Sequence, residues 1–318
     1  MKRRANANRE YVIIWRVLQC PSILIIDYKY QTVSFKNIKK EIKNMNVLSL
    51  FDGISCGKLA LKKAGIKVEN YYASEIKEIA ISVSNDNHKD IQQLGDIKNW
   101  KNWDIKNIDL IIFGSPCQDL SIAMKNRKGL QGINSNLFYT ALDILNFYKP
   151  KYFLMENVAR MSKDNNEIIT KLLKVEPVRI NSKLLSGQLR DRLYWTNIPN
   201  VTIPKDKNIQ LQSILTNGYT DREKSRAILV SESRPLKDQY KMYRRYSKTG
   251  FTTIVFNDSN FDYTKGIRYF NQQELEKLQT LPLNYTKILN RNKAANVIGD
   301  AWTVDVITHI LKKIKDDI

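Results

Sequence analysis

Residues that bind metals or form disulfides are scarce in this 318-residue sequence, which has three cysteines (Cys20, Cys56 and Cys117) and two histidines. These residues are scattered, and no pair of them has the spacing of a metal site. Three thiols also do not make a disulfide framework. The sequence therefore predicts a protein that holds no metal and is kept reduced in the cytoplasm.

The chain also lacks an uninterrupted apolar run of membrane-spanning length near its start. Residues 11–26 are apolar, but Arg16 and Pro21 interrupt them. The stretch is shorter than the roughly 20 apolar residues that a membrane-spanning helix needs. It has no small-residue cleavage site of the kind that follows a signal peptide. We therefore expect no contact with a membrane.

Acidic residues are outnumbered, because 32 Asp and Glu stand against 52 Lys and Arg, which gives a formal net charge of +20. Such a balance is typical of a protein that meets a polyanion. The alternative explanation is an AT-rich genome, which enriches Lys, Asn and Ile. Residues 241–248 interleave basic and tyrosine side chains. That pattern suits either contact with phosphates and bases or an ordinary solvated face.

What the sequence does contain is an alternation of apolar strands and helical stretches, which begins at Met45 after a basic leader of residues 1–44. Strands are expected at residues 47–51, 68–73, 109–113 and 152–155. Helices are expected at residues 58–64, 79–84 and 136–147. The alternation predicts an α/β fold built on a doubly wound, Rossmann-like, mostly parallel sheet.

The pattern changes after Pro199. Residues 200 to about 265 have weaker periodicity and shorter elements. Helical patterning returns at Asn271, and residues 301–313 are expected to form one amphipathic helix. We therefore expect four segments, with the bounds 1–44, 45–199, 200–265 and 266–318.

Two short motifs are the most informative feature of the chain. Gly114-Ser115-Pro116-Cys117-Gln118 follows one apolar strand, and Glu156-Asn157-Val158 stands at the end of the next. In a parallel sheet both motifs lie at the carboxyl edge, where open α/β sheets place their ligands. A thiol and a carboxylic acid in one pocket suit covalent addition to an electron-poor ring, as in alkylation of cytosine at carbon 5. A buried, inert thiol is the alternative for Cys117 taken alone.

A second group of residues indicates a nucleotide-like ligand. The turn after the first strand, residues 51–57, contains Gly53 and Gly57, which allow close approach of a ligand to the backbone. It is neither the three-glycine dinucleotide fingerprint nor a triphosphate loop. Glu75 ends the second strand, where an acid can accept from a ribose diol, and Asp96 can accept from an exocyclic amine. The glycine turn, Glu75 and Asp96 together fit an adenosine-containing ligand. Taken separately, the turn is also an ordinary strand–helix turn, and each acid is also an ordinary surface or turn residue.

At this point the chain resembles the cytosine-C5-specific DNA methyltransferase family. The resemblance runs from Met45 to about Leu311, and its motifs appear in the family's order. It is closest to the branch of de novo-type and phage or bacterial enzymes with a short target-recognition region. The matching segments are Phe51-Asp52-Gly53 with Gly57, Gly114–Gln118, Glu156-Asn157-Val158, Gln188-Leu189-Arg190-Asp191-Arg192, Arg268 through Glu274 with Leu278, Gln279 and Pro282, and residues 299–304.

The resemblance implies an enzyme that uses S-adenosylmethionine, leaves S-adenosylhomocysteine, and methylates carbon 5 of a cytosine flipped from duplex DNA. It implies that the Cys117 thiolate attacks carbon 6. Glu156 contacts ring nitrogen 3 and the amino group, Arg192 binds the ring carbonyl oxygen, and Arg190 supports the site or a phosphate. It further implies a monomer of bacterial or phage origin that belongs to restriction-modification or a related DNA methylation process.

The resemblance also assigns contacts and segments. Residues 45–199 become the catalytic and cofactor-binding domain, 200–265 the target-recognition region, and 266–318 the return to the catalytic domain. The expected cofactor contacts are Phe51, Asp52, Gly53, Ile54, Ser55, Glu75, Ile76, Asp96, Ile97, Pro116, Leu137 and Trp302. The expected DNA contacts are Gln118, Ser121, Arg127, Arg222, Lys224, Arg226, Arg234, Arg244 and Arg245.

Alternatives remain beside this interpretation. A transfer-RNA cytosine-5 methyltransferase belongs to a related branch, whose Cys-Phe-Thr signature is absent here because Cys117 is the last cysteine. A catalytically inactive DNA-binding relative is the other alternative. Two departures from the family pattern, Asp300 and Asp305, remove no group that the chemistry needs. Residues 1–44 lie outside the resemblance, as a lineage-specific extension or a start assigned too early.

Overall fold

The computed structural model describes residues 25–28, 31–34, 44–115, 136–230, 234–250 and 252–317. The chain divides into two units, residues 1–43 and 44–318. In the first unit, β1 (Ile25–Tyr28) and β2 (Gln31–Ser34) pair as an antiparallel hairpin. Within the described ranges, no helix has the length and apolar character required to cross a bilayer.

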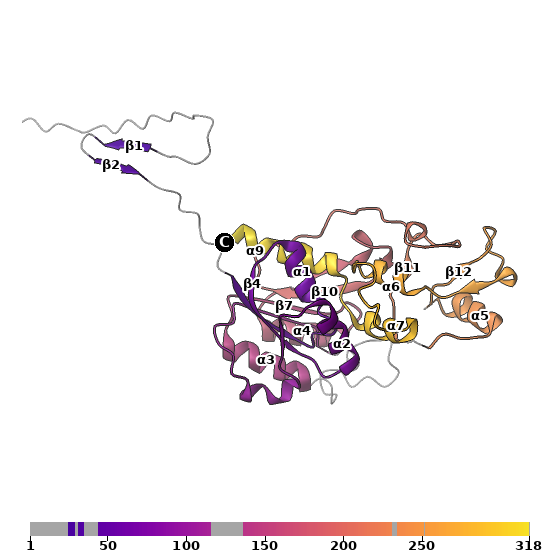
Figure 1. The fold of residues 1–318 in the computed structure, drawn as a ribbon, viewed down its shortest axis with the longest axis horizontal. Helices are drawn as coiled ribbons and strands as arrows, with labels where there is room; N and C mark the ends of the chain where they lie inside the picture. The colour runs from indigo at the N-terminus through magenta and orange to yellow at the C-terminus, as the bar shows by residue number, and fades with distance from the viewer. Residues whose placement is uncertain are drawn as a thin grey trace, which may run out of the picture. The chain divides into compact units, whose positions relative to one another are not determined.

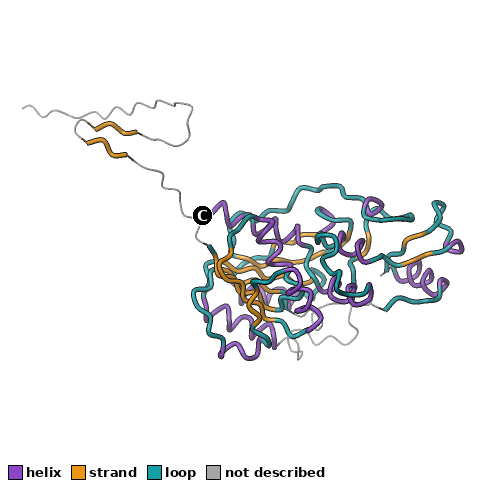
Figure 2. The backbone as a smooth tube through the Cα atoms, in the orientation of Figure 1, coloured by secondary structure: helices purple, strands orange, loops and turns teal. Residues whose placement is uncertain are grey.

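A seven-stranded sheet forms the centre of the second unit, in the order β5-β4-β3-β6-β7-β10-β8 (Figures 1 and 2). Strands β3 to β7 run parallel, whereas β10 is antiparallel to both of its neighbours. The predicted doubly wound, mostly parallel sheet is therefore confirmed. The bounds are β3 Met45–Leu50, β4 Val68–Ser74, β5 Ile91–Gln93, β6 Leu110–Phe113, β7 Tyr152–Val158, β8 Val178–Asn181 and β10 Asp191–Thr196.

The central strands are buried on both faces, which explains why they are continuously apolar rather than alternating. In β6, Leu110 and Ile112 face one core while Ile111 and Phe113 face the other. Helices α3 (Asn136–Tyr148) and α4 (Lys163–Leu173) cover the second core. Helices α1 (Cys56–Ala64) and α2 (Glu78–Asn87) cover the opposite face (Figure 1).

Local signals set the helix ends. Helix α1 ends at Gly65, whose left-handed backbone (φ 68°) lets its N–H bond back to the last turn, as the sequence predicted. Helix α6 (Gln272–Leu278) begins with a reciprocal capping box between Asn271 and Glu274. These ends need no tertiary contact, because the residues that satisfy the helix termini are neighbours in sequence.

The chain returns to the face of the sheet that α1 and α2 cover through α7 (Arg291–Asp300), α8 (Val304–Leu311) and α9 (Lys313–Asp317). Helix α8 packs against α1, so the two ends of the second unit meet. The prediction of one amphipathic helix over 301–313 was wrong at its start, because α8 begins only at Val304, and the helix is interrupted after Leu311. Ala301 caps α7 and Thr303 precedes α8, so Trp302 lies in a linker between two helices.

The described residues after β10 form mostly short elements. These include β11 (Ser225–Arg226), which pairs with β9 (Gln188–Leu189) just before β10, then α5 (Gln239–Thr249), and the hairpin of β12 (Val255–Phe256) and β13 (Ile267–Arg268). A separate small core joins α5 to this hairpin through Met242, Tyr246 and Phe256. The β12–β13 hairpin spans residue 265, so this core draws on residues from both sides of the expected boundary.

Candidate active site

The centre of the site is Glu156 on β7, with Arg192 on the neighbouring strand β10. In the antiparallel register Tyr194 lies opposite Glu156, so Arg192, two residues away, lies on the same face. Arg192 Nε is 2.7 Å from Glu156 Oε1, and the two side chains are only 15% and 12% exposed. Strand β7 continues through Val158, so Glu156 belongs to the strand itself.

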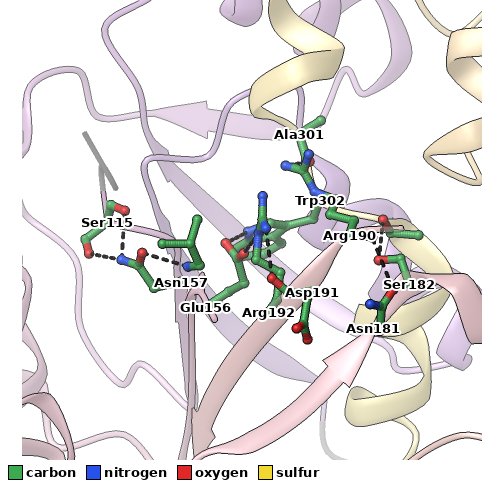
Figure 3. A network of polar contacts seen from close by, with 12 residues as sticks. Ser115, Glu156, Asn157, Asn181, Ser182, Arg190, Asp191, Arg192, Ala301 and Trp302 are labelled. Atoms are coloured by element: carbon green, nitrogen blue, oxygen red, sulfur yellow. Dashed lines mark hydrogen bonds and ion pairs between the residues drawn. The ribbon is translucent and has the colours of Figure 1, made fainter. Parts of the chain in front are cut away.

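A third residue reaches the same carboxylate from a distant part of the chain. Trp302 Nε1 donates a 2.9 Å hydrogen bond to Glu156 Oε2 (Figure 3). Both carboxylate oxygens therefore have a donor, one from β10 and the other from the linker between α7 and α8. This arrangement fixes the plane of the Glu156 carboxyl group at the carboxyl edge of the sheet.

The start of the cysteine motif lies beside this carboxylate. Phe113 pairs with Met155 in the parallel register, so Gly114, which follows β6, lies beside Glu156. The buried Asn157 amide donates to Ser115 Oγ (3.1 Å) and, more weakly, to the Ser115 carbonyl (3.3 Å), as Figure 3 shows. The sequence identified Asn157 only as part of the Glu156-Asn157-Val158 motif and did not predict its contact with Ser115. Pro116, Cys117 and Gln118 lie outside the described residues.

Arg190 is built into the interior of the protein. It is 5% exposed, and its guanidinium donates to the backbone carbonyls of Ile228 (3.2 Å), Gly299 (3.2 Å) and Ala301 (3.0 Å). Figure 3 shows it beside Ala301 and Trp302. These contacts join the residue between β9 and β10 to the end of α7, which favours support of the site over contact with a phosphate.

The loop that follows β3 has an unusual backbone. Phe51 (φ 56°), Gly53 (φ 59°) and Ser55 (φ 59°) all adopt left-handed conformations, which cost free energy for the two residues that are not glycine. The Gly53 N–H donates to Glu75 Oε2 at 2.8 Å. The Ile76 and Lys77 N–H groups donate to the other carboxylate oxygen. The loop and the acid that follows β4, Glu75, are therefore held together by these hydrogen bonds.

Asp52 supports this loop from behind. Its buried carboxyl group accepts from Ser55 Oγ (2.5 Å) and the Tyr71 hydroxyl (2.7 Å). Burial raises the pKa of Asp52 against the opposing effect of these hydrogen bonds. Ile54 and Ser55 are also buried. Of the expected cofactor contacts in this loop, these three therefore face the protein interior.

Other expected contacts remain accessible at the sheet edge. Ile76 is 68% exposed, which is unusual for a large apolar side chain and fits a flat ring beside the Glu75 carboxylate. A Cβ atom added to Gly53 or Gly95 would meet nothing within 4 Å. Asp96 is exposed enough to accept further bonds while it caps a short 3₁₀ helix, whereas Ile97 is buried and Leu137 half-buried. This open, acid-lined edge fits an adenosine-containing cofactor.

A half-buried histidine, His88, anchors the same loop. The Tyr285 hydroxyl donates to the Ile54 carbonyl (2.8 Å), so its oxygen accepts from His88 Nε2 at 3.0 Å. Burial, aided by the charge of Lys58, lowers the pKa of His88 to about 4 from its ordinary 6.5. Between those two values the unfolded chain binds a proton that the folded protein does not.

We therefore expect stability to fall as the pH drops from 6.5 toward 4. His88→Gln has no such titrating group. The difference in free energy of unfolding between the wild type and this variant should therefore shrink by about 1 kcal/mol as the pH falls from 6.5 to 4. The expected change is this small because the partial exposure of His88 screens the effect. Urea denaturation at several pH values measures it. Above pH 7 the difference should be constant, and a constant difference down to pH 4 would contradict the prediction.

The expected DNA contacts separate into two groups. Arg226, Arg234 and Arg244 are exposed and Arg245 is half-buried. Arg222 stacks on the Tyr246 ring (4.1 Å from guanidinium carbon to centroid) and bonds to its hydroxyl. Lys224 donates to three backbone carbonyls, those of Lys183, Ser186 and Ile209. Arg222 therefore packs within residues 200–265, and Lys224 ties that segment to residues 183–186. Ser121 and Arg127 lie outside the described residues.

Sequence reasoning missed one further link at this edge. Lys77, next to Ile76, forms an ion pair with Asp300 at the end of α7 (2.5 Å). No sequence signal reports it, because the partners are far apart in the chain and each alone is an ordinary surface charge. Within the described ranges, no group of three or more His, Cys, Asp and Glu is placed to hold a metal ion.

The fold defines a Rossmann-like α/β protein whose polar sheet edge carries the Glu156–Arg192 ion pair. The profile of the C-5 cytosine-specific DNA methylase family matches residues 45–195 and 183–316. The chain belongs to that family.

The chain is similar to several known proteins. It is 29% identical over 201 residues to the type II methyltransferase M.NgoBV of Neisseria gonorrhoeae, covering 56% of this chain and 47% of that protein. It is 31% identical over 178 residues to the orphan methyltransferase M.Rho11sI of Bacillus phage rho11s, covering 52% and 35%. The chain thus spans about half the length of these relatives or less.

One solved structure supports the fold. The crystal structure of S. pombe Dnmt2 methyltransferase superimposes with a TM-score of 0.61, covering 86% of this chain and 99% of that one at 17% identity. At that identity the likeness concerns the fold alone.

Proposed function

We propose that this protein is an S-adenosylmethionine-dependent DNA (cytosine-5-)-methyltransferase. The observation that carries the proposal is the Glu156 carboxylate, held between Arg192 and Trp302 at the carboxyl edge of the sheet. An acceptor and a cation side by side match the amino group and the carbonyl oxygen of a cytosine ring. Family membership supports cytosine in DNA as the substrate.

The described residues also support a cofactor of the expected kind. When bound, S-adenosylmethionine supplies an electrophilic methyl group. Glu75 would accept from the ribose hydroxyls, Ile76 would pack on the adenine, and Asp96 would accept from its amine. Asp52 and Ser55 would act indirectly, because they hold the backbone of the loop from the interior.

In the proposed reaction, the target cytosine is rotated out of duplex DNA into the space beside Glu156. The Cys117 thiolate forms a bond to carbon 6, which makes carbon 5 nucleophilic. Glu156 accepts from the amino group and, in its protonated form, donates its proton to nitrogen 3, where negative charge develops, while Arg192 donates to the ring oxygen. After carbon 5 gains the methyl group, a base takes the carbon 5 proton, the double bond between carbons 5 and 6 re-forms, and the sulfur leaves as thiolate.

Contacts to DNA are proposed for residues 200–265, the expected target-recognition region. Helix α5 buries Met242 and Tyr246, which leaves Arg244 on the exposed side. Arg226 and Arg234 are exposed in the preceding segment. Exposed arginines suit phosphate contacts and bidentate contacts to guanine, so duplex DNA is the partner that this surface fits.

The test is bisulfite sequencing of plasmid DNA from cells that express the protein, with Cys117→Ser as the inactive variant. We expect cytosines in one sequence context to be protected by the wild type and not by the variant. The same experiment identifies the recognised sequence. Protection by both proteins, or by neither when both are soluble and folded, would contradict the proposal; methylation of transfer RNA alone would assign the chain to the RNA branch instead.

A further inference from the structure

The backbone around Trp302 is fixed on both sides. The Ala301 carbonyl accepts from Arg190 Nη2 and Gln279 Nε2, each at 3.0 Å. The Thr303 hydroxyl donates to Gln279 Oε1 at 2.8 Å. Ala301 and Thr303 are both buried. The linker between α7 and α8 therefore presents the Trp302 side chain in one direction.

That direction leads to the catalytic carboxylate. The indole N–H of Trp302 donates to Glu156 Oε2 at 2.9 Å, across 146 residues of sequence (Figure 3). Gly114 lies against both atoms of this bond. A Cβ atom at that position would come within 3.0 Å of Trp302 Nε1 and 3.1 Å of Glu156 Oε2. The missing side chain of Gly114 thus leaves the room that the bond occupies.

The bond completes the support of Glu156. Arg192 Nε holds Oε1, and with that contact alone the carboxyl group can turn about its own Cγ–Cδ bond. A second donor on Oε2 removes this freedom. Each carboxylate oxygen has two lone-pair sites, so both oxygens can still meet a ring bound in the pocket.

We propose that Trp302 is a positioning residue for Glu156, and that its indole N–H, apart from any contact between its ring and the cofactor, orients the carboxylate toward the target base. This inference rests on the proposed function. Because the same side chain lies at the edge expected to hold the cofactor, Trp302 joins the cofactor site to the base pocket through one hydrogen bond.

The test separates the N–H from the ring. Trp302→Phe keeps an aromatic ring and removes the donor. The matched control is Trp195→Phe, which removes an indole hydrogen bond of the same length, to Thr170 Oγ1, on the far side of β10. For both variants the rate of covalent adduct formation with 5-fluorocytosine DNA and the affinity for S-adenosylhomocysteine are measured. The duplex carries the sequence found by bisulfite mapping.

We expect Trp302→Phe to slow adduct formation by about tenfold or more, the effect of losing a hydrogen bond to a charged group. Its affinity for S-adenosylhomocysteine should change by less than about threefold, because an aromatic ring remains. Trp195→Phe should form the adduct at nearly the wild-type rate.

Each other outcome overturns something definite. A wild-type rate for Trp302→Phe overturns the positioning role and leaves the proposed function intact. A loss of affinity for S-adenosylhomocysteine that matches the loss of rate makes Trp302 a cofactor contact only. A wild-type protein that forms no adduct overturns the proposed function and this inference with it. If Trp302→Phe does not fold, Gly114→Ala tests the same bond from the other side and should give the same slow adduct.

Discussion

Glu156→Gln is expected to lower the methylation rate by about two to four orders of magnitude, the range typical of losing a positioned acid–base group. The amide is nearly the same size, so packing is kept. It carries no charge to pair with Arg192 and presents a donor where the carboxylate presented an acceptor. Single-turnover methylation of a matched duplex at saturating cofactor measures the effect.

The control for this variant is Glu167→Gln on α4. Glu167 makes an exposed ion pair with Lys163, so the same change of carboxylate to amide should leave the rate near that of the wild type. Binding of S-adenosylhomocysteine should survive in both variants, because neither residue is among the expected cofactor contacts. A Glu156→Gln rate within a factor of about ten of wild type would remove Glu156 from the chemistry.

Arg190→Ala is expected to lower the free energy of unfolding by about 3 kcal/mol or more. The reason is that the carbonyls of Ile228, Gly299 and Ala301 lose a shared, buried, charged donor, and each unsatisfied acceptor is costly. Urea denaturation of the wild type and the variant measures the change. Loss of activity should follow loss of structure, because the linker that carries Trp302 is released.

Arg179→Ala is the matched comparison. Arg179 lies on the neighbouring strand β8 and pairs with Asp191, yet its side chain is 66% exposed. Surface ion pairs of this kind contribute about 0–1 kcal/mol, so a small change is expected. An Arg190→Ala variant that is as stable as Arg179→Ala but inactive would instead place Arg190 in the chemistry or in contact with DNA.

The fold was predictable wherever its signals are local. Strand β6 is an apolar run of four residues, and its length, composition and burial on both faces follow from that run. Gly65 ends α1 because a glycine adopts the left-handed cap at little cost. The antiparallel direction of β10 was not predictable, because an apolar strand reads the same in either direction.

The helix expected over 301–313 shows why some local signals mislead. The apolar pattern continues through Ala301 and Trp302, but the Ala301 carbonyl is used by Arg190 and Gln279, and the Thr303 hydroxyl by Gln279. These tertiary hydrogen bonds hold the backbone in an extended linker. The competition between a local helix and distant partners is invisible in a sequence pattern.

The alternation of strands and helices and the order of the motifs, and with them the family, were readable from the sequence, because they depend on neighbours along the chain. The two donors on Glu156, the burial of Arg190, the binding of Lys224 to backbone carbonyls and the exposure of Ile76 emerged from the folded structure alone. Hydrogen-bond partners and burial depend on which distant segments pack together, and a sequence pattern does not report that packing.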